Sequence, residues 1–202
     1  MSLFIQNTNQ NLLPKGGEVF YFGKIFDEHQ SQNYLHKLLE NINWEQDNAV
    51  IFGKQIVVNR KVAWYGNGGQ NYTYSGTTKV ATKWTKELLE IKKMVENYTQ
   101  VEFNSCLLNL YANGGQGMGW HSDSEKELGK NTTIASVSFG ANREFRFRHK
   151  KDKNLKTSVV LESGSLLIMK GETQQNWLHQ IPKSGKVLEP RVNLTFRTIL
   201  GA

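Results

Sequence analysis

One short segment of this 202-residue chain carries the residue types of a metal site. His121 and Asp123 are separated by one residue, so on an extended backbone their side chains point to the same face. An imidazole and a carboxylate placed in this way are two of the three protein ligands that non-haem Fe(II) sites use. His179, far along the chain, is a candidate for the third ligand. A surface aspartate that orients a neighbouring histidine would show the same spacing, so the motif does not establish a metal site by itself.

The other histidines are poorer candidates for the third position. His29 and His36 lie in or near an expected helix, where local partners can satisfy them. His149 stands in a run of basic residues, whose charges oppose the binding of a cation. The hypothesis of a three-ligand centre therefore depends on His179.

A strand near the end of the chain alternates between apolar and polar residues. Its apolar face consists of Val192, Leu194 and Phe196, and its polar face of Arg191, Asn193, Thr195 and Arg197. A solvated sheet face would show this pattern, and so would a barrel lumen that holds an anion. Two arginines on a strand of this length, roughly 20 Å long, could bracket a small dicarboxylate, because guanidinium pairs bidentately with carboxylate. Asn109 and Tyr111 share a face in the same manner and could donate to the oxygens of an acid.

The elements that must position these residues fall into two parts. Asp27 begins an expected helix with Gln30 as its capping-box partner, and a second helix is expected over residues 82–98, with Trp84 and Tyr98 on its apolar face. From residue 101 onward, apolar runs alternate with turns, and the expected strands are 101–111, 132–139, 143–149, 157–162, 165–170, 175–181 and 192–199. Residues 2–17 are expected to form a loose arm. The fold class is therefore α+β with a jelly roll or related barrel.

Taken in order, these segments resemble the AlkB family of Fe(II)- and 2-oxoglutarate-dependent dioxygenases. The resemblance covers essentially all of residues 101–202 and is carried by Asn109-Leu-Tyr111, Met118-Gly-Trp-His121-Ser-Asp123, Ser136-Val-Ser138-Phe-Gly140, Arg143-Glu-Phe-Arg-Phe147, Ser163-Gly-Ser-Leu-Leu-Ile-Met169, Trp177-Leu-His179-Gln-Ile-Pro182 and Arg191-Val-Asn-Leu-Thr-Phe-Arg197. A looser upstream match is similar to the branch that repairs duplex DNA, and it comprises Phe52-Gly53-Lys54, Arg60-Lys61 and Tyr72-Thr-Tyr74-Ser-Gly76.

The resemblance implies one dioxygenase domain over residues 1–202. Its core would be a double-stranded β-helix (jelly roll) over 101–202, with helices and a nucleotide-recognition lid in 1–100. It implies that Fe(II) is bound by His121, Asp123 and His179, and that 2-oxoglutarate is bound by Asn109, Tyr111, Arg191, Asn193 and Arg197. Dioxygen is the second cosubstrate. The implied reaction hydroxylates the N-methyl group of a base such as 1-methyladenine or 3-methylcytosine in DNA, and the product then loses formaldehyde; no catalytic residue is expected beyond the metal centre.

An enzyme that acts on a base within a duplex must first take it out of the stack. Phe52, beside a glycine, is the candidate wedge for the vacated position, and Tyr72 and Tyr74 are candidate walls for the extruded base. Ordinary core packing is the alternative for Phe52. Glu125 resembles the acidic position with which the family reads an exocyclic amino group, and an exposed loop acid is its alternative.

Basic residues supply a second signal for nucleic acid. Arg60 and Lys61 are candidate substrate contacts, and residues 143–156 hold seven basic side chains against two acidic ones. Such a patch suits phosphate groups, although a solvated hairpin would look alike. The net charge of +7 is compatible with a polyanionic partner.

Composition limits the remaining possibilities. A single cysteine excludes an intrachain disulfide and fits a reducing compartment, and no apolar run is long enough to span a membrane. We therefore expect a monomer in the cytoplasm, or in the nucleus if the source is eukaryotic. Two alternatives stay open: the same oxygenase chemistry on methylated RNA or another substrate, and a metal-free nucleic-acid-binding module. The second leaves the paired arginines and the histidines unexplained.

Overall fold

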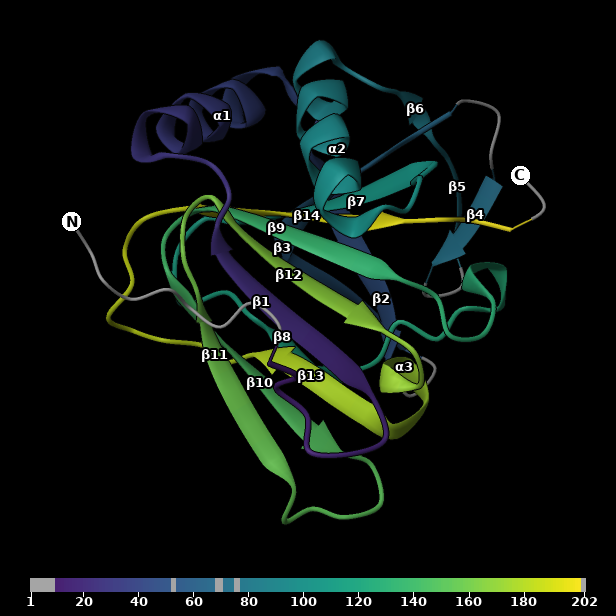
Figure 1. Ribbon diagram of the computed structural model, residues 1–202. Coiled ribbons are helices and arrows are strands. Elements are labelled where there is room, and N and C mark those ends of the chain that lie inside the picture. Colours follow the sequence, from purple (N-terminus) through teal and green to yellow (C-terminus); the bar gives the residue numbers. More distant parts are fainter. Residues whose placement is uncertain (1–9, 52–53, 68–70, 75–76, 201–202) are drawn as a thin grey trace.

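Two antiparallel sheets face each other in the computed structural model, and two helices cover the outer side of the larger sheet (Figure 1). The structure describes residues 10–51, 54–67, 71–74 and 77–200. Within this part, the larger sheet has the strand order β1-β12-β9-β14-β7-β3-β2, with β6 pairing β3, and the smaller sheet has the order β11-β10-β13-β8. This arrangement is the double-layered architecture of the jelly roll that the sequence predicted.

The larger sheet is built from β1 (Glu18–Lys24), β2 (Glu45–Ile51), β3 (Lys54–Gly66), β6 (Thr82–Lys83), β7 (Ser105–Tyr111), β9 (Ile134–Gly140), β12 (Ser165–Lys170) and β14 (Arg191–Arg197). The smaller sheet is built from β8 (Met118–His121), β10 (Arg143–His149), β11 (Lys156–Leu161) and β13 (Trp177–Ile181). A separate hairpin consists of β4 (Asn71–Tyr74) and β5 (Thr77–Val80). The helical elements are α1 (Glu28–Asn41), α2 (Lys86–Thr99), the single 3₁₀ turn η1 (Lys126–Leu128) and the short α3 (Thr173–Asn176).

The seven strands expected after residue 101 are confirmed, each within a few residues of its expected range. The apolar face expected on β14 is confirmed, because Val192, Leu194 and Phe196 are fully buried in the core under the helices. The sequence did not predict β8, whose four residues include Gly119 and show no regular alternation. This short strand ends in the metal-ligand candidate His121.

Both helices begin at the capping residues that the sequence supplies. Asp27 and Gln30 form the expected capping box at the start of α1. The second helix begins later than expected, because Thr85 caps it and the two residues Thr82–Lys83 pair with β3. Leu88, Ile91 and Val95 pack against the sheet, whereas Tyr98, expected on that face, is 45% exposed.

Segments from the first hundred residues take part in the sheet and its cover. β1, β2 and β3 extend the larger sheet on both sides of the strands that follow residue 101. Residues 10–17 do not form a loose arm: the Asn11 side chain accepts from the backbone N–H groups of Leu13 and Val19, and Leu13 is 2% exposed. These local bonds fix the segment against the core between the two sheets. No helix in the described residues is long and apolar enough to cross a membrane.

Candidate metal centre and cosubstrate pocket

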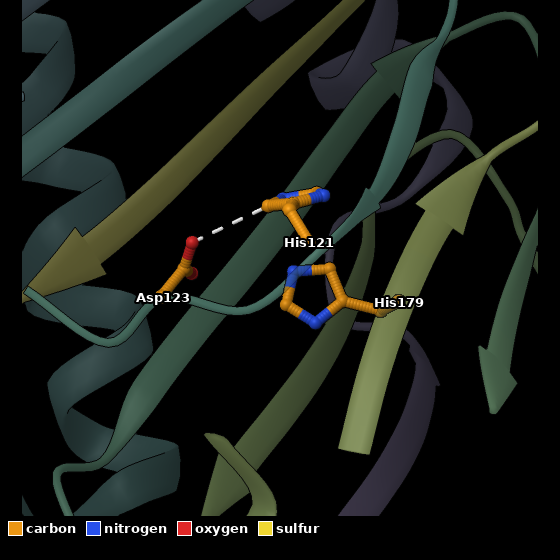
Figure 2. A group of neighbouring side chains, drawn as sticks. All are labelled: His121, Asp123 and His179. Atoms are coloured by element: carbon orange, nitrogen blue, oxygen red, sulfur yellow. Dashed lines mark ion pairs between the residues drawn. The ribbon is translucent and has the colours of Figure 1, made fainter. Parts of the chain in front are cut away.

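The three predicted metal ligands come together between the two sheets (Figure 2). His121 ends β8 and stands directly opposite His179 on β13, so the two imidazoles project from the same face of the smaller sheet. Asp123 follows two residues after His121, and the two side chains approach to 4.0 Å between Nε2 and Oδ1. Ligand atoms of all three residues lie within 4.8 Å of one another. One divalent cation could therefore contact all three side chains after small adjustments.

The two histidine ligands differ in their hydrogen bonding. Nδ1 of His121 lies 2.8 Å from the carbonyl oxygen of Gly119, and when Nδ1 carries the proton the lone pair of Nε2 points to the side of Asp123. His179 is 3% exposed, and its Nδ1 is buried with no hydrogen-bond partner. A buried polar atom without a partner is costly, so a ligand bound to this centre would compensate for part of that cost.

The charges around the centre put its ligands in the metal-binding protonation state. Burial alone would raise the pKa of Asp123, but the Arg197 guanidinium, 3.0 Å away, together with the two histidines holds that pKa below its usual range. Burial, reinforced by His121, lowers the pKa of His179 to about 3. At neutral pH the site thus offers an ionised carboxylate and a neutral buried imidazole, the donor set of two histidines and one carboxylate that suits Fe(II).

Gln174, which the sequence did not single out, and Lys150, which it assigned only to the basic run, hold the loop that carries Asp123. The backbone N–H of Asp123 donates to Oε1 of buried Gln174 at 2.9 Å. Nζ of Lys150 donates to Oγ of Ser122 and to the carbonyl oxygen of Gln174. The ligand loop is thereby attached to the start of the segment that leads to His179.

Replacing Gln174 with leucine is expected to weaken metal binding about 10- to 100-fold, since partners that orient a metal ligand typically contribute that much. Leucine keeps the side-chain bulk but leaves the buried N–H of Asp123 without an acceptor. Metal affinity can be measured by titration of the apoprotein with Fe(II) under anaerobic conditions. Gln175→Leu, at the exposed neighbouring position, is the matched control. Equal affinities in the two variants would contradict this positioning role.

A cavity adjoins the three ligands, and both sheets line it with apolar and polar side chains. Asn109, Tyr111, Asn193, Thr195 and Arg197, the polar residues expected on one face of their strands, all contribute to its wall together with His121, Asp123 and His179. Register explains this, because Asn109 on β7 stands directly opposite Asn193 on β14. The structure thus brings these five side chains into one cavity with the three candidate metal ligands.

Arg191, the remaining residue of the predicted polar face, lies behind the Tyr111 ring and is not part of the cavity wall. Its Cζ lies 5.4 Å from the centroid of that ring, and its Nη2 donates to Oγ of Ser138 and Oδ1 of Asn193. The side chain is fully buried, and its Nε and Nη1 have no hydrogen-bond partner. Burial lowers the pKa of Arg191 to about 10, so the group stays charged at neutral pH. A buried cation with two unused donors is suited to an anion.

Comparison with known proteins identifies the family. The model of the 2OG-Fe(II) oxygenase superfamily matches residues 18–197. A DNA oxidative demethylase of Homo sapiens, ALKBH2, is 42% identical over 186 residues, which cover 89% of this chain and 71% of the relative. The chain belongs to the AlkB family of these oxygenases. AlkB-family enzymes are dioxygenases that use Fe(II) and 2-oxoglutarate, and the donor set of the metal centre and the arginines of the pocket fit both groups.

Further members of the AlkB family are also similar. The alpha-ketoglutarate-dependent dioxygenase alkB homolog 3 of Homo sapiens is 37% identical over 199 residues, covering 94% of this chain and 69% of the relative. Both human relatives therefore extend beyond the region that matches. Among solved structures, OsALKBH1 superposes with a TM-score of 0.63 at 16% identity, covering 89% of this chain and 96% of that one, which supports the shared fold.

The residues expected to contact nucleic acid in this AlkB-family chain are only partly described. Phe52 lies outside the described residues, and so do the side chains of Tyr72 and Tyr74, whose backbone forms β4. Arg60 is buried, and its Nε donates to Oδ1 of Asn109 at 2.8 Å, which places it against the cosubstrate pocket. Lys61, the next residue, is exposed.

Glu125 lies just beyond the ligand loop, where it precedes η1. Its side chain is half-buried, and its Oε2 is buried without a hydrogen-bond partner. Glu125 is not among the residues that line the cavity at the metal ligands. The prediction that Glu125 reads a base remains a prediction at this point.

The basic run over residues 143–156 does not act as one surface. Arg143 is 3% exposed, so its guanidinium is not available to phosphate groups as the sequence suggested. Arg146 pairs with Glu144 at 2.7 Å, and Lys150 is bonded to the ligand loop. The remaining exposed or half-exposed basic residues on the β10–β11 hairpin, here called the hairpin cations, are Arg148, Lys151, Lys153 and Lys156. Arg148 stacks on the ring of Trp120, with 4.5 Å between its Cζ and the ring centroid.

Proposed function

We propose that this dioxygenase is an oxidative demethylase that repairs N-alkylated bases, of the 1-methyladenine and 3-methylcytosine type, in DNA. The observation that carries the proposal is the position of Glu125, whose buried carboxylate oxygen without a partner lies two residues beyond the metal ligand Asp123. An exocyclic amino group of adenine or cytosine can donate to such an oxygen while the neighbouring ring nitrogen carries the methyl group. The name and the 42% identity of human ALKBH2 support DNA as the substrate.

The reaction needs little chemistry from side chains. The bound iron supplies the activation of dioxygen, coupled to conversion of 2-oxoglutarate into succinate and carbon dioxide. His121, Asp123 and His179 would hold the iron. Hydroxylation of the N-methyl group gives a hemiaminal, whose C–N bond breaks to release formaldehyde and the unmodified base. One oxygen atom of dioxygen enters succinate and the other leaves in formaldehyde, so the atoms balance.

The cosubstrate contacts are assigned from the pocket. Arg191, with its two unused donors, would bind the distal carboxylate of 2-oxoglutarate together with Tyr111 and Asn193. Arg197 lies on the metal side of the cavity, beside Asp123, and would orient the end that carries the 2-oxo group. Asn109, directly opposite Asn193, would donate to the acid between its two ends. Asp123 and His179 are buried between the two sheets, whereas His121 is partly exposed, so the metal site faces solvent from the side of His121.

The substrate contacts extend outward from the metal. Phe52 would fill the gap left by the extruded base, and Tyr72 and Tyr74 would stack against that base. Lys61, exposed on β3, would contact the nucleic acid, and the hairpin cations would bind phosphate groups. Arg60, expected from the sequence to contact the substrate, is buried and would act instead through its hydrogen bond to Asn109. In this scheme residues 1–202 act as one domain and as a monomer, with the lid contributed by residues 1–100. The enzyme would act where its DNA is, in the cytoplasm or, in a eukaryote, the nucleus.

The proposal is tested with oligonucleotides that carry 1-methyladenine or 3-methylcytosine, as single and double strands of DNA and RNA. We expect formaldehyde and the repaired base from DNA, dependent on both Fe(II) and 2-oxoglutarate. Faster turnover of methylated RNA would replace DNA as the substrate, in line with the alternative considered from the sequence. Decarboxylation of 2-oxoglutarate without repair of any methylated base would rule out a nucleic-acid substrate.

The Phe52→Ala variant is expected to lose repair of duplex DNA selectively. Unstacking a base costs a few kcal/mol in a duplex and less in a single strand, so the wedge matters mainly in the duplex. Repair rates of the same methylated base in both contexts give the measurement. Leu89→Ala, at a position that is 48% exposed on α2, is the control. Equal losses on the two substrates would assign Phe52 to folding, and no loss on duplex would remove it from the mechanism.

A further inference from the structure

We propose that Arg143 makes the cosubstrate site specific for a diacid, because it adds a second positive charge at the end of the pocket where Arg191 lies. The inference rests on the proposed binding of the distal carboxylate by Arg191. It concerns which 2-oxo acid the site prefers. All such acids share the 2-oxo carboxylate group that would face the metal, and they differ at the distal end of the carbon chain.

The guanidinium of buried Arg143 uses only some of its hydrogen-bond donors. It begins β10 in the smaller sheet and is 3% exposed. Its Nη2 donates to the carbonyl oxygens of Gln116 and Pro182, at 2.9 and 2.7 Å. Its Nη1 is buried and has no hydrogen-bond partner. One face of the guanidinium is therefore anchored to backbone, while one donor remains available inside the protein.

The two buried arginines meet at one aromatic ring. Cζ of Arg143 lies 5.8 Å and Cζ of Arg191 lies 5.4 Å from the centroid of the Tyr111 ring. Tyr111 itself lines the cavity that contains the metal ligands. Arg143 comes from the smaller sheet and Arg191 from the larger one. A cation from each sheet thus lies against the ring of Tyr111, although neither arginine forms part of the cavity wall.

These charges have no counter-charge in the described part of the chain. Neither Arg143 nor Arg191 forms an ion pair there, whereas Arg197 at the metal end is paired with Asp123. Burial lowers the pKa of both arginines, and the positive charge of Arg143 lowers that of Arg191 further. Two like charges kept from water destabilise one another, and an anion placed between or beside them reverses the sign of that effect.

Selectivity follows from this charge. A 2-oxo acid with a carboxylate at its distal end would neutralise the pair, whereas one with a methyl group there would leave both cations uncompensated. A purely structural role gives a different expectation. Arg143 also connects the 113–117 segment to Pro182, where Gly114 is already bonded to Val187 and Ser184 and any side chain at Gly114 would meet the Ser184 carbonyl. Loss of such a connection would weaken the binding of all 2-oxo acids alike.

The test compares 2-oxoglutarate with 2-oxovalerate, which has the same chain length but ends in a methyl group. Binding to the anaerobic, Fe(II)-loaded protein is measured by calorimetry, so that turnover is not needed. Arg143→Met and Arg143→Gln remove the charge, Arg143→Lys keeps it, and Arg146→Met, on the exposed face of the same strand, is the control. We expect both neutral variants to bind 2-oxoglutarate at least about 10-fold more weakly, with 2-oxovalerate changed less than about 2-fold. Arg143→Lys should retain most of the preference.

Each other result overturns the inference. Equal weakening of the two acids would assign Arg143 to the structure of the 113–117 segment, as would failure of both neutral variants to fold while Arg143→Lys folds. No change in either acid would show that Arg143 does not act on the cosubstrate. Arg191→Met, measured in parallel, separates the proposals: if it alone weakens 2-oxoglutarate binding, the subsite at Arg191 stands and only the role of Arg143 fails.

Discussion

Turnover should fall below detection when His179 is replaced by alanine. Iron binding should weaken by more than about 10- to 100-fold, which is the typical loss when a residue that only hydrogen-bonds to a metal ligand is removed. His179 is the one ligand that comes from outside the His121–Asp123 segment, so without it the remaining two groups form a short chelate on one loop. The imidazole is already neutral in the fold, with its pKa lowered to about 3, so no proton has to leave it when metal binds. Its loss removes a ready ligand.

Iron affinity by anaerobic titration and formaldehyde release from a methylated oligonucleotide give the two readouts. Circular dichroism of the variant establishes that the fold survives. His36→Ala is the matched control, because His36 is an exposed histidine of α1 that faces Glu40 on the same helix. A His179→Ala enzyme with full activity would show that the metal centre has been placed on the wrong residues.

The residues that line the cosubstrate pocket could be predicted because they lie on strands, where alternate side chains share a face. On β14, and at Asn109 and Tyr111 of β7, polar and apolar residues alternate, so the face of each side chain follows from the sequence. The structure adds the register, with Asn109 opposite Asn193. The pairing of His121 with His179 could not be predicted in this way. β8 is too short to show a period, and its partner β13 lies far along the chain, so only the completed sheet reveals that the two histidines are neighbours.

The residues that support the ligand loop could not be predicted from the sequence for a related reason. Gln174 and Lys150 act through single hydrogen bonds to the ligand loop, and such contacts leave no pattern in composition or spacing. Arg143 was assigned to a basic surface because it opens a run of basic residues. It is instead buried, since alternation along β10 turns Arg143, Phe145 and Phe147 inward and Arg146 outward. Strand alternation applies to charged residues as well as to apolar ones, and on β10 it places Arg143 on the buried face and Arg146 on the exposed face.

The second large effect is expected at Arg191. Arg191→Lys keeps a positive charge but loses the planar fork that can pair with a carboxylate through two donors. Loss of a charge-assisted hydrogen bond costs about 1.5–3 kcal/mol, so the 2-oxoglutarate concentration needed for half-maximal turnover should rise roughly 10- to 100-fold. Iron affinity without the cosubstrate should stay unchanged, because Arg191 stands behind Tyr111 and does not contact the ligands.

Arg197→Lys supplies the contrast that makes this prediction specific. Arg197 lies 3.0 Å from Oδ2 of Asp123, so its replacement should weaken both iron and 2-oxoglutarate binding. Arg146→Lys, on an exposed side chain paired with Glu144, should alter neither. If Arg191→Lys and Arg197→Lys both keep the parent's dependence on 2-oxoglutarate, the two arginines do not bind the cosubstrate. One variant is thus expected to affect the acid alone and the other to affect the acid and the metal together. The reason is the separation of the two arginines along β14, with Arg197 in the cavity wall beside Asp123 and Arg191 behind the ring of Tyr111.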